Sequence, residues 1–258
     1  MALIPAERRN QIRALVQAQG SVRVNELSDR FGVSELTIRR DLEKLEQQGI
    51  LERTHGGAIS IRRIREAPLY SEKYALHHTE KQQIGTAAAR LVEDGDTVFI
   101  GGGSTTVQIF KHLAGRQDLR VVTNNMGAVP EVQHLDLDLI LIGGSYHKSF
   151  NSSVGPLATL VLRQIYATKC IIGVDGISPA FGLTEPLIQW AEIARLMIER
   201  TKGQVIVVAD HSKFGRVADY VIAPLDQVDV LVVDSHFDER YRDEIEAQGV
   251  QILIAPDV

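Results

Sequence analysis

Small and polar residues that can bind an anion follow a short apolar run near the middle of the chain. The run Thr97–Ile100 is followed by Gly101–Thr106, with the sequence GGGSTT. Glycines after a strand let backbone N–H groups approach an anion, and the next helix presents its N-terminus to it. Serine and threonine add hydroxyl donors. We therefore expect the phosphate of a small molecule to contact Gly102, Gly103, Ser104 and Thr105, with a plain tight turn as the alternative.

Polar groups also follow other runs that are typical of strands. Lys213 lies in such a segment and can supply a cation to the same anion, while Asp175 can accept hydrogen bonds from sugar hydroxyls. Asn124 follows a further run and joins this candidate ligand site. The alternatives are an exposed loop lysine at Lys213 and a helix-capping or turn residue at Asp175.

Sequence patterns for a cofactor, a metal or a hydrolytic triad are weak. Gly101–Thr106 is not a dinucleotide fingerprint, because Thr106 stands where the last glycine belongs, and no Gly-Lys-Ser/Thr follows to make a P-loop. The adjacent pair His77–His78 points about 100° apart on a helix and does not converge on one metal ion. No Gly-x-Ser-x-Gly elbow anchors a Ser-His-Asp triad. We expect no cofactor, no metal site and no catalytic residues.

A second group of chemically suggestive residues lies near the N-terminus. Arg39 and Arg40 are adjacent, and the guanidinium fork can bond two acceptors of guanine or grip a phosphate. Thr37 can reach a phosphate or the methyl group of thymine. The alternative is a helix with two solvated arginines beside Asp41 and Glu43.

The elements around these arginines predict how they are presented. Apolar spacing indicates helices over Ala6–Gln19 and Val24–Phe31, each followed by a glycine, and Ser34 is the expected N-cap of a third helix. Its apolar stripe leaves Arg39 and Arg40 facing outward. Two short strands then enclose a turn of a hairpin wing, with Arg53 and His55 near the tip. Residues 1–61 therefore read as a winged helix-turn-helix, whose third helix enters the major groove.

The rest of the chain predicts a linker, residues 62–79, and an α/β domain, residues 80–258. Arg62–Arg65 is a basic run that either contacts phosphate or stays solvated, and Pro68 suggests a hinge. Beyond it, β-branched runs alternate with amphipathic helices, which indicates a mostly parallel sheet covered on both sides. The predicted strands are Thr97–Ile100, Arg120–Thr123, Leu139–Ile142, Cys170–Val174, Gln204–Ala209, Val228–Val233 and Ile252–Ala255. Ligands bind at the carboxyl ends of such strands.

Composition agrees with two domains of different character. The 258 residues carry a net charge of −5, yet residues 1–65 hold twelve Lys/Arg against eight Asp/Glu. A basic head on an acidic body suits a small DNA reader joined to a soluble sensor. No apolar run is long enough to span a bilayer and no signal peptide is evident, so we expect a cytoplasmic protein. Cys170, the single cysteine, is expected to be a buried structural thiol.

The motifs Ser34–Leu42 (SELTIRRDL) and Arg53–Ala58 (RTHGGA) resemble the DeoR family of bacterial regulators. The resemblance continues through Gly103–Thr105 and Asp210–Gly215 and so covers essentially the whole chain. It implies Thr37, Arg39 and Arg40 as DNA-contacting residues, and a sensor domain similar in fold to ribose-5-phosphate isomerase. The chain departs from the family pattern at Gly101, where many members carry an acid, and at residues 190–195 (WAEIAR).

Together these features predict a repressor-like regulator, and not an enzyme. Its partners would be a DNA operator, contacted by Ser34, Thr37, Arg39, Arg40, Arg53 and His55, and a small, phosphorylated metabolite. A single winged helix buries limited area on DNA, so a homodimer or homotetramer on paired half-sites is expected. The alternative is a sugar-phosphate isomerase with an appended DNA-binding head, for which Glu185 or Glu192 would be the general base.

Overall fold

The N-terminal head is a three-helix unit. The computed structural model describes residues 3–54, 56–64, 66 and 68–257, and places helices at α1 (Pro5–Gln19), α2 (Val24–Phe31) and α3 (Glu35–Gln47). The first two helices end at left-handed glycines, Gly20 and Gly32, and the Ser34 side chain accepts a hydrogen bond from the Thr37 backbone N–H. These boundaries confirm the helix predictions. The helices enclose a small apolar core that includes Ile12, Val16, Leu27, Ile38, Leu42 and Leu45.

A wing follows the third helix. Strands β2 (Leu51–Thr54) and β3 (Gly57–Ser60) form an antiparallel hairpin, and β1 (Ser21–Arg23) pairs with the outer side of β3. Gly57 allows this close pairing, because a Cβ on it would lie 1.9 Å from the Val22 carbonyl oxygen. The predicted winged helix-turn-helix is therefore present. His55 lies outside the described residues.

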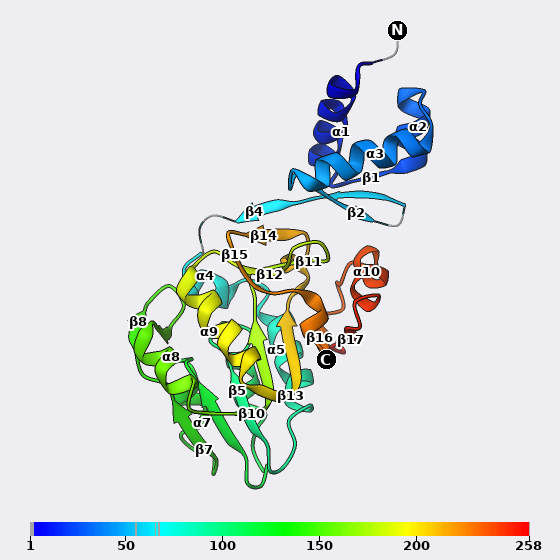
Figure 1. Ribbon diagram of the computed structural model, residues 1–258. Helices are drawn as coiled ribbons and strands as arrows, with labels where there is room; N and C mark the ends of the chain where they lie inside the picture. Colours follow the sequence, from blue (N-terminus) through cyan, green and yellow to red (C-terminus); the bar gives the residue numbers. More distant parts are fainter. Residues whose placement is uncertain (1–2, 55, 65, 67, 258) are drawn as a thin grey trace.

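The segment expected as a linker holds regular structure that contacts the body. Strand β4 (Arg62–Ile64) pairs in parallel with β14 (Arg216–Ala218) of the C-terminal part, and helix α4 (Tyr70–Ala75) follows. Figure 1 shows β4 running from the head across the top of the body. The head is thus connected to the body by a backbone-paired strand and a short helix.

The body is built around a seven-stranded sheet in which every neighbouring pair is parallel. Its order is β17-β16-β13-β10-β5-β6-β7. All seven predicted strands are in this sheet, so the parallel α/β prediction is confirmed. Their bounds are β5 (Thr97–Ile100), β6 (Arg120–Thr123), β7 (Asp138–Leu141), β10 (Ala167–Gly173), β13 (Thr201–Ala209), β16 (Val230–Val233) and β17 (Gln251–Ile254).

Helices cover both faces of this sheet. One face packs against α5 (His78–Ala89), α6 (Val107–Phe110) and α7 (Ala128–Val132), and the other against α8 (Pro156–Leu162), α9 (Ile188–Glu199) and α10 (Arg242–Glu246). Side chains alternate between the two cores along each strand: Ile171 faces the first, while Cys170 and Ile172 face the second. Cys170 is free and fully buried, as expected, and burial raises the pKa of its thiol to about 12.

Short strands that the sequence did not reveal lie beside the large sheet. They form a hairpin, β8 (Ser145–His147) with β9 (Ser152–Val154), and an antiparallel sheet of β11 (Gly176–Ser178), β12 (Gly182–Glu185) and β15 (Tyr220–Ala223). Runs of three or four residues are too short to show an alternating pattern. The remaining turns are the 3₁₀ segments η1 (His211–Lys213), η2 (Leu225–Gln227) and η3 (Glu239–Tyr241). Across the described ranges, no helix has the length and apolar character needed to cross a membrane.

Candidate functional sites: a recognition helix and a strand-end pocket

The outer face of α3 carries the two arginines that the sequence singled out. Arg39 and Arg40 are both exposed, while Ile38 on the same helix is buried in the head. The Arg39 side chain is 51% exposed and lies 3.6 Å from the Glu35 carboxylate, one turn earlier. An exposed i,i+4 pair of this kind contributes little stability, so the guanidinium remains available to another acceptor.

The N-terminus of α3 presents hydroxyl groups and one exposed apolar side chain. Ser34 Oγ and Thr37 Oγ1 are 2.9 Å apart, and the Thr37 backbone N–H donates to Ser34 Oγ over 3.3 Å. Ser34 therefore has a capping role in addition to any contact with DNA. Leu36, which the sequence analysis did not single out, is 60% exposed between them. Its exposure could have been predicted from the sequence, because Leu36 lies opposite the apolar stripe of the helix. An exposed leucine there can pack on a thymine methyl group.

Asp41, which follows Arg40 on α3, pairs with two other arginines, both of them on α1. Its buried carboxylate contacts Arg8 Nε at 2.5 Å and Arg9 Nη1 at 3.3 Å. A buried carboxylate needs such partners, and the pair fixes α3 against α1. Asp41 therefore does not face the surface that carries Arg39 and Arg40.

Arg53 lies in the wing beside α3. Its backbone N–H donates to Glu46 Oε1 over 2.9 Å, and its Nε lies 3.7 Å from Glu46 Oε2. Arg53 and Arg39 border the same hollow, which has a volume of about 380 Å³ and also touches Glu244 of the body. Helix α3 and the wing thus present Arg39 and Arg53 on adjoining surfaces.

A pocket at the carboxyl ends of the strands brings most of the predicted ligand-binding residues together. Its volume is about 30 Å³, close to that of one water molecule, so its own side chains nearly fill it. The predicted residues in its lining are Gly102, Gly103, Ser104, Thr105, Asp175 and Lys213. Residues that the sequence analysis did not assign to a ligand also line it: Tyr70, Lys73, Phe150, Glu185 and Trp190.

The glycine-rich loop supplies free hydrogen-bond donors to this pocket. Within the described part of the chain, neither the backbone N–H groups nor the hydroxyls of Ser104 and Thr105 donate to another protein group. Both residues are nevertheless buried, with only 7% of their surface exposed. Buried donors normally have partners, so this cluster suits an anion that accepts several hydrogen bonds. The helix that follows, α6, has only four residues, so the expected contribution of a helix N-terminus is small, and the loop offers most of the donors to an anion.

Asn124 supports this loop from beneath. It is fully buried; its Oδ1 accepts from the Gly102 backbone N–H over 2.9 Å, and its Nδ2 donates to the Ser153 carbonyl over 2.9 Å. Both ends of its amide are thus occupied within the protein. The neighbouring Asn125 Nδ2 donates to the Gly103 carbonyl over 3.2 Å. The two asparagines position the loop, and Asn124 does not line the pocket.

Asp175 is held between two lysines at the other side of the pocket. Lys73 donates to Asp175 Oδ2, and Lys213 Nζ lies 3.3 Å from Oδ1. Burial alone would raise the pKa of Asp175, but the two ammonium groups lower it to about 2. The Lys213 side chain is only 12% exposed, so it is not a solvated loop lysine. Lys73 comes from α4, in the segment expected as a linker.

Glu185, at the end of β12, is the second buried carboxyl in the pocket. Its Oε2 has no hydrogen-bond partner in the described structure. Burial raises its pKa well above the ordinary value, and the negative charge of Asp175 raises it further. A carboxyl of this kind is favoured in its neutral form and can donate a hydrogen bond to a ligand. Glu192, the other residue considered as a general base, is exposed on α9 and does not line the pocket.

Two stacked aromatic rings form one wall of the pocket. Phe150 and Trp190 stack with ring centroids 4.6 Å apart and an interplanar angle of 27°. Gly102 approaches this wall so closely that a Cβ would lie 2.4 Å from Trp190 Cη2 and 2.2 Å from Ser152 Oγ. The glycine is therefore required by close packing.

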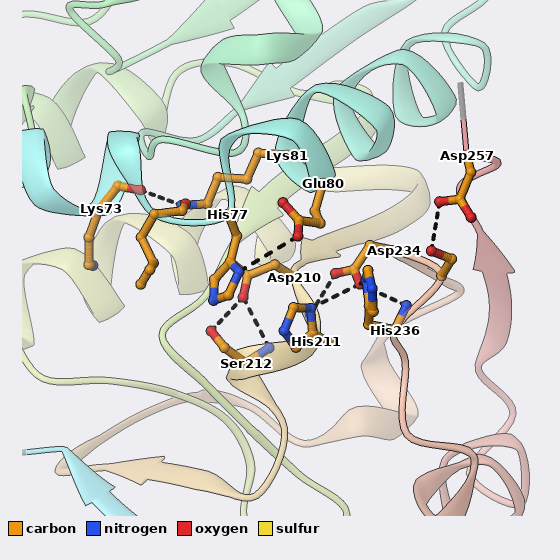
Figure 2. Close-up of polar contacts among 12 residues, drawn as sticks. Lys73, His77, Glu80, Lys81, Asp210, His211, Ser212, Asp234, His236 and Asp257 are labelled. Carbon is orange, nitrogen blue, oxygen red and sulfur yellow. Dashed lines mark hydrogen bonds and ion pairs between the residues drawn. The ribbon is translucent and has the colours of Figure 1, made fainter.

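A larger cavity adjoins the pocket and reaches the segment between the head and the body. It has a volume of about 440 Å³, and Lys73, Asp175 and Lys213 line both spaces. Its other cations are Arg62, Arg63, Lys81 and Arg216. Lys81 donates hydrogen bonds to the backbone carbonyls of Lys73 and Leu76 and thereby holds α4 in place. Figure 2 shows the hydrogen bond to the Lys73 carbonyl. Burial lowers the pKa of Lys81 to about 8.

Known protein families account for both parts of the chain. The family described as the DeoR-like helix-turn-helix domain matches residues 8–63, and the DeoR C terminal sensor domain matches residues 76–235. The second match alone covers more than half of the chain.

Curated relatives match over nearly the full length. The HTH-type transcriptional regulator GlpR of Haloferax volcanii is 32% identical over 97% of this chain and 98% of that protein. The transcriptional repressor AccR of Agrobacterium fabrum is 34% identical over 89% of each chain. The HTH-type transcriptional regulator IolR of Bacillus subtilis is 30% identical over 95% of this chain and 97% of that protein.

Solved structures match at lower similarity. Ribose-5-phosphate isomerase from Methanocaldococcus jannaschii has 15% identity and a TM-score of 0.40, and the match covers 54% of this chain and 55% of that chain. The eIF2B beta subunit from Chaetomium thermophilum has 17% identity and a TM-score of 0.42, with 60% and 50% covered.

The recognition helix and its wing, the strand-end pocket and these full-length relatives lead to one conclusion. The three curated relatives are named transcriptional regulators or a repressor, and each match covers 89% or more of this chain. The chain belongs to the DeoR family: it is a DNA-binding transcriptional regulator with a C-terminal sensor domain, and not an enzyme.

Proposed function

We propose that this regulator binds a small phosphorylated metabolite in the strand-end pocket, and that the metabolite controls operator binding. The observation that carries the proposal is the group of unpartnered donors on Ser104 and Thr105, which face the same pocket as Lys73 and Lys213. Hydroxyls, backbone N–H groups and ammonium groups are the donors that a phosphate accepts. Asp175 and the Glu185 carboxyl lie across the pocket, where sugar hydroxyls would be paired.

On the DNA side, we propose that α3 reads the major groove. Arg39 and Arg40 would contact bases or phosphates, with Ser34 and Thr37 on the adjoining backbone. Arg53 would bind phosphate from the wing. His55, expected beside it, lies outside the described residues. The exposure of both arginines on α3 and the basic balance of residues 1–65 support this assignment.

The link between the two sites would be α4. The pocket measures about 30 Å³, whereas ligand sites usually measure about 300 Å³ or more. We therefore infer that a sugar phosphate extends into the adjoining cavity or moves a side chain that now fills the pocket. Lys73 and Tyr70 are the two that belong to α4. An anion competes with Asp175 for the Lys73 ammonium group, and any shift of α4 acts on β4, which leads to the wing. Such a ligand changes DNA affinity only if it prefers one of the two arrangements.

We further propose a repressor that works as a homodimer or homotetramer in the cytoplasm. A single winged helix buries too little area for useful operator affinity, so paired half-sites about one helical turn apart are expected. The name of the AccR relative supports repression. Sedimentation equilibrium measures the assembly, and a monomer at operator-binding concentrations would rule out paired binding; cell fractionation checks the location.

A thermal-shift panel tests the effector proposal. Phosphorylated sugars should raise the melting temperature of the full chain, while the matched unphosphorylated sugars should not, because a ligand that binds only the folded state stabilises it. Ser104→Asp should abolish the shift through like-charge repulsion. Thr79→Asp is the control, since it adds the same charge at an exposed position outside the pocket. If Ser104→Asp showed the same shift in melting temperature as the parent, the phosphate would not bind at this loop.

A further inference from the structure

Two histidines and one aspartate converge at a place that the effector pocket does not use. His211 Nδ1 lies 2.9 Å from Asp234 Oδ1, and His236 Nδ1 lies 3.3 Å from the same oxygen. The three candidate ligand atoms all lie within 4.8 Å of one another. Figure 2 shows both imidazole rings turned toward the Asp234 carboxylate.

Neighbouring parallel strands bring these residues together. His211 begins η1, just after β13, while Asp234 and His236 follow β16, and β13 pairs directly with β16. Carboxyl ends of adjacent parallel strands lie side by side, so residues more than twenty positions apart meet there. This convergence is not visible in the sequence, where the adjacent pair His77–His78 is the candidate and no metal site is expected. His77 in the structure packs edge-on against His211, with ring centroids 4.6 Å apart.

The Asp234 carboxylate is fixed and lacks a permanent cation. It is fully buried, its Oδ2 accepts from the His211 backbone N–H over 2.7 Å, and its Oδ1 accepts from the His236 backbone N–H over 2.9 Å. Within the described residues its ion pairs are both with histidines. A buried carboxylate is costly without a compensating positive charge, and backbone donors of this kind orient a metal ligand.

We propose that His211, Asp234 and His236 bind one zinc ion. Zinc prefers imidazole nitrogen and carboxylate oxygen at about 2.0–2.2 Å, and tetrahedral bonds of that length place two ligand atoms roughly 3.4 Å apart. In the structure, His211 Nδ1 and Asp234 Oδ1 form a hydrogen bond of 2.9 Å, and His236 Nδ1 lies 3.3 Å from the same oxygen. Zinc would therefore replace the shared proton and move the ligand atoms apart by a few tenths of an ångström. With Nε2 protonated, each neutral imidazole offers the Nδ1 lone pair. The fourth position is open to water, because the His236 side chain is 65% exposed.

The zinc ion has a structural role at this place. His211 and Lys213 are the two ends of η1, so an ion on His211 fixes the turn that presents Lys213 to the effector pocket. Zinc that binds only the folded state also raises its stability by mass action.

Equilibrium dialysis against zinc alone tests the site. The tag-free full chain, stripped with a chelator, is dialysed against a zinc series, and bound metal is measured by elemental analysis. We expect saturation at one zinc ion per chain. His236→Asn should weaken binding at least tenfold without unfolding the protein, because this side chain is exposed. His134→Asn is the matched control, an exposed histidine outside the cluster, and should bind as the parent does.

Two results would overturn the site. One is zinc binding by the parent that does not saturate, or that His236→Asn leaves unchanged, which would indicate adventitious surface binding only. The other is an equal loss in His134→Asn. A melting-temperature series of the three proteins with and without zinc gives a second readout: only His236→Asn should fail to gain stability.

Discussion

At the scale of single residues, Glu52 shows how closely the head is joined to the body. This wing residue is fully buried, and its Oε1 accepts hydrogen bonds from Ser178 Oγ over 2.9 Å and from the Ala180 backbone N–H over 2.8 Å. Its Oε2 has no partner in the described structure. Burial raises the pKa of Glu52 to about 7 in spite of these hydrogen bonds.

This pKa predicts a pH-dependent contact between head and body. The folded protein holds the Glu52 proton more tightly than the unfolded chain, whose ordinary value is 4.5, so ionisation costs stability as pH rises from about 4.5 through about 7. The full cost is on the order of 3 kcal/mol. Glu52→Gln keeps the accepting oxygen without the charge and should melt at a higher temperature than the parent at pH 8, with the gap closing toward pH 5. A gap that does not change with pH would contradict the assignment.

The sequence indicated the pocket residues that lie at strand ends, but not those that helix packing brings to the pocket. Gly102–Thr105, Asp175 and Lys213 stand at predicted strand ends, so their convergence followed from the parallel sheet. Tyr70 and Trp190 carry no such signal: both lie on helices, and only the packing of those helices brings them to the pocket.

At the scale of elements, helix α4 is the one that brings a lysine from outside the large sheet to the pocket. This helix was invisible in the segment expected as a linker, because six residues with one flanking proline show no clear period. It brings Lys73 to Asp175, and its position depends on the buried Lys81. The long, regular elements were predicted because their apolar positions recur, whereas α4 and the short strands around the pocket depend on tertiary contacts.

Lys73→Gln should weaken ligand binding and remove the effect of the ligand on operator binding, while operator binding itself is kept. The variant lacks one of two cations next to Asp175, so the affinity for a phosphorylated ligand should fall about tenfold or more, and the ligand should no longer change operator affinity. Operator binding without ligand should stay within about threefold of the parent. Titration calorimetry and fluorescence anisotropy measure the two affinities.

Lys111→Gln serves as the control for this variant, since Lys111 is exposed and outside both cavities. It should behave as the parent does in both assays. If Lys73→Gln kept a normal ligand response, α4 would not be the transmitter.

At the scale of the whole molecule, the chain is a basic reading head on a larger acidic body. Figure 1 shows the head at one end, with β4 as the strand that joins it to the body. The sequence predicts this division because residues 1–65 hold twelve Lys/Arg against eight Asp/Glu, whereas the rest of the chain holds sixteen against twenty-five. It was insufficient for the docking of the two parts, which rests on single contacts such as Glu52 with Ser178.

The most direct measurement is an operator titration of the Arg39→Ala, Arg40→Ala double variant. Operator fragments selected by the parent from a randomised duplex pool are titrated at fixed salt by fluorescence anisotropy. Each base-reading arginine contributes about 1–3 kcal/mol, so the double variant should bind at least thirtyfold more weakly, while its sensor domain melts as in the parent. If the double variant bound the operator as tightly as the parent, α3 would not be the element that reads DNA.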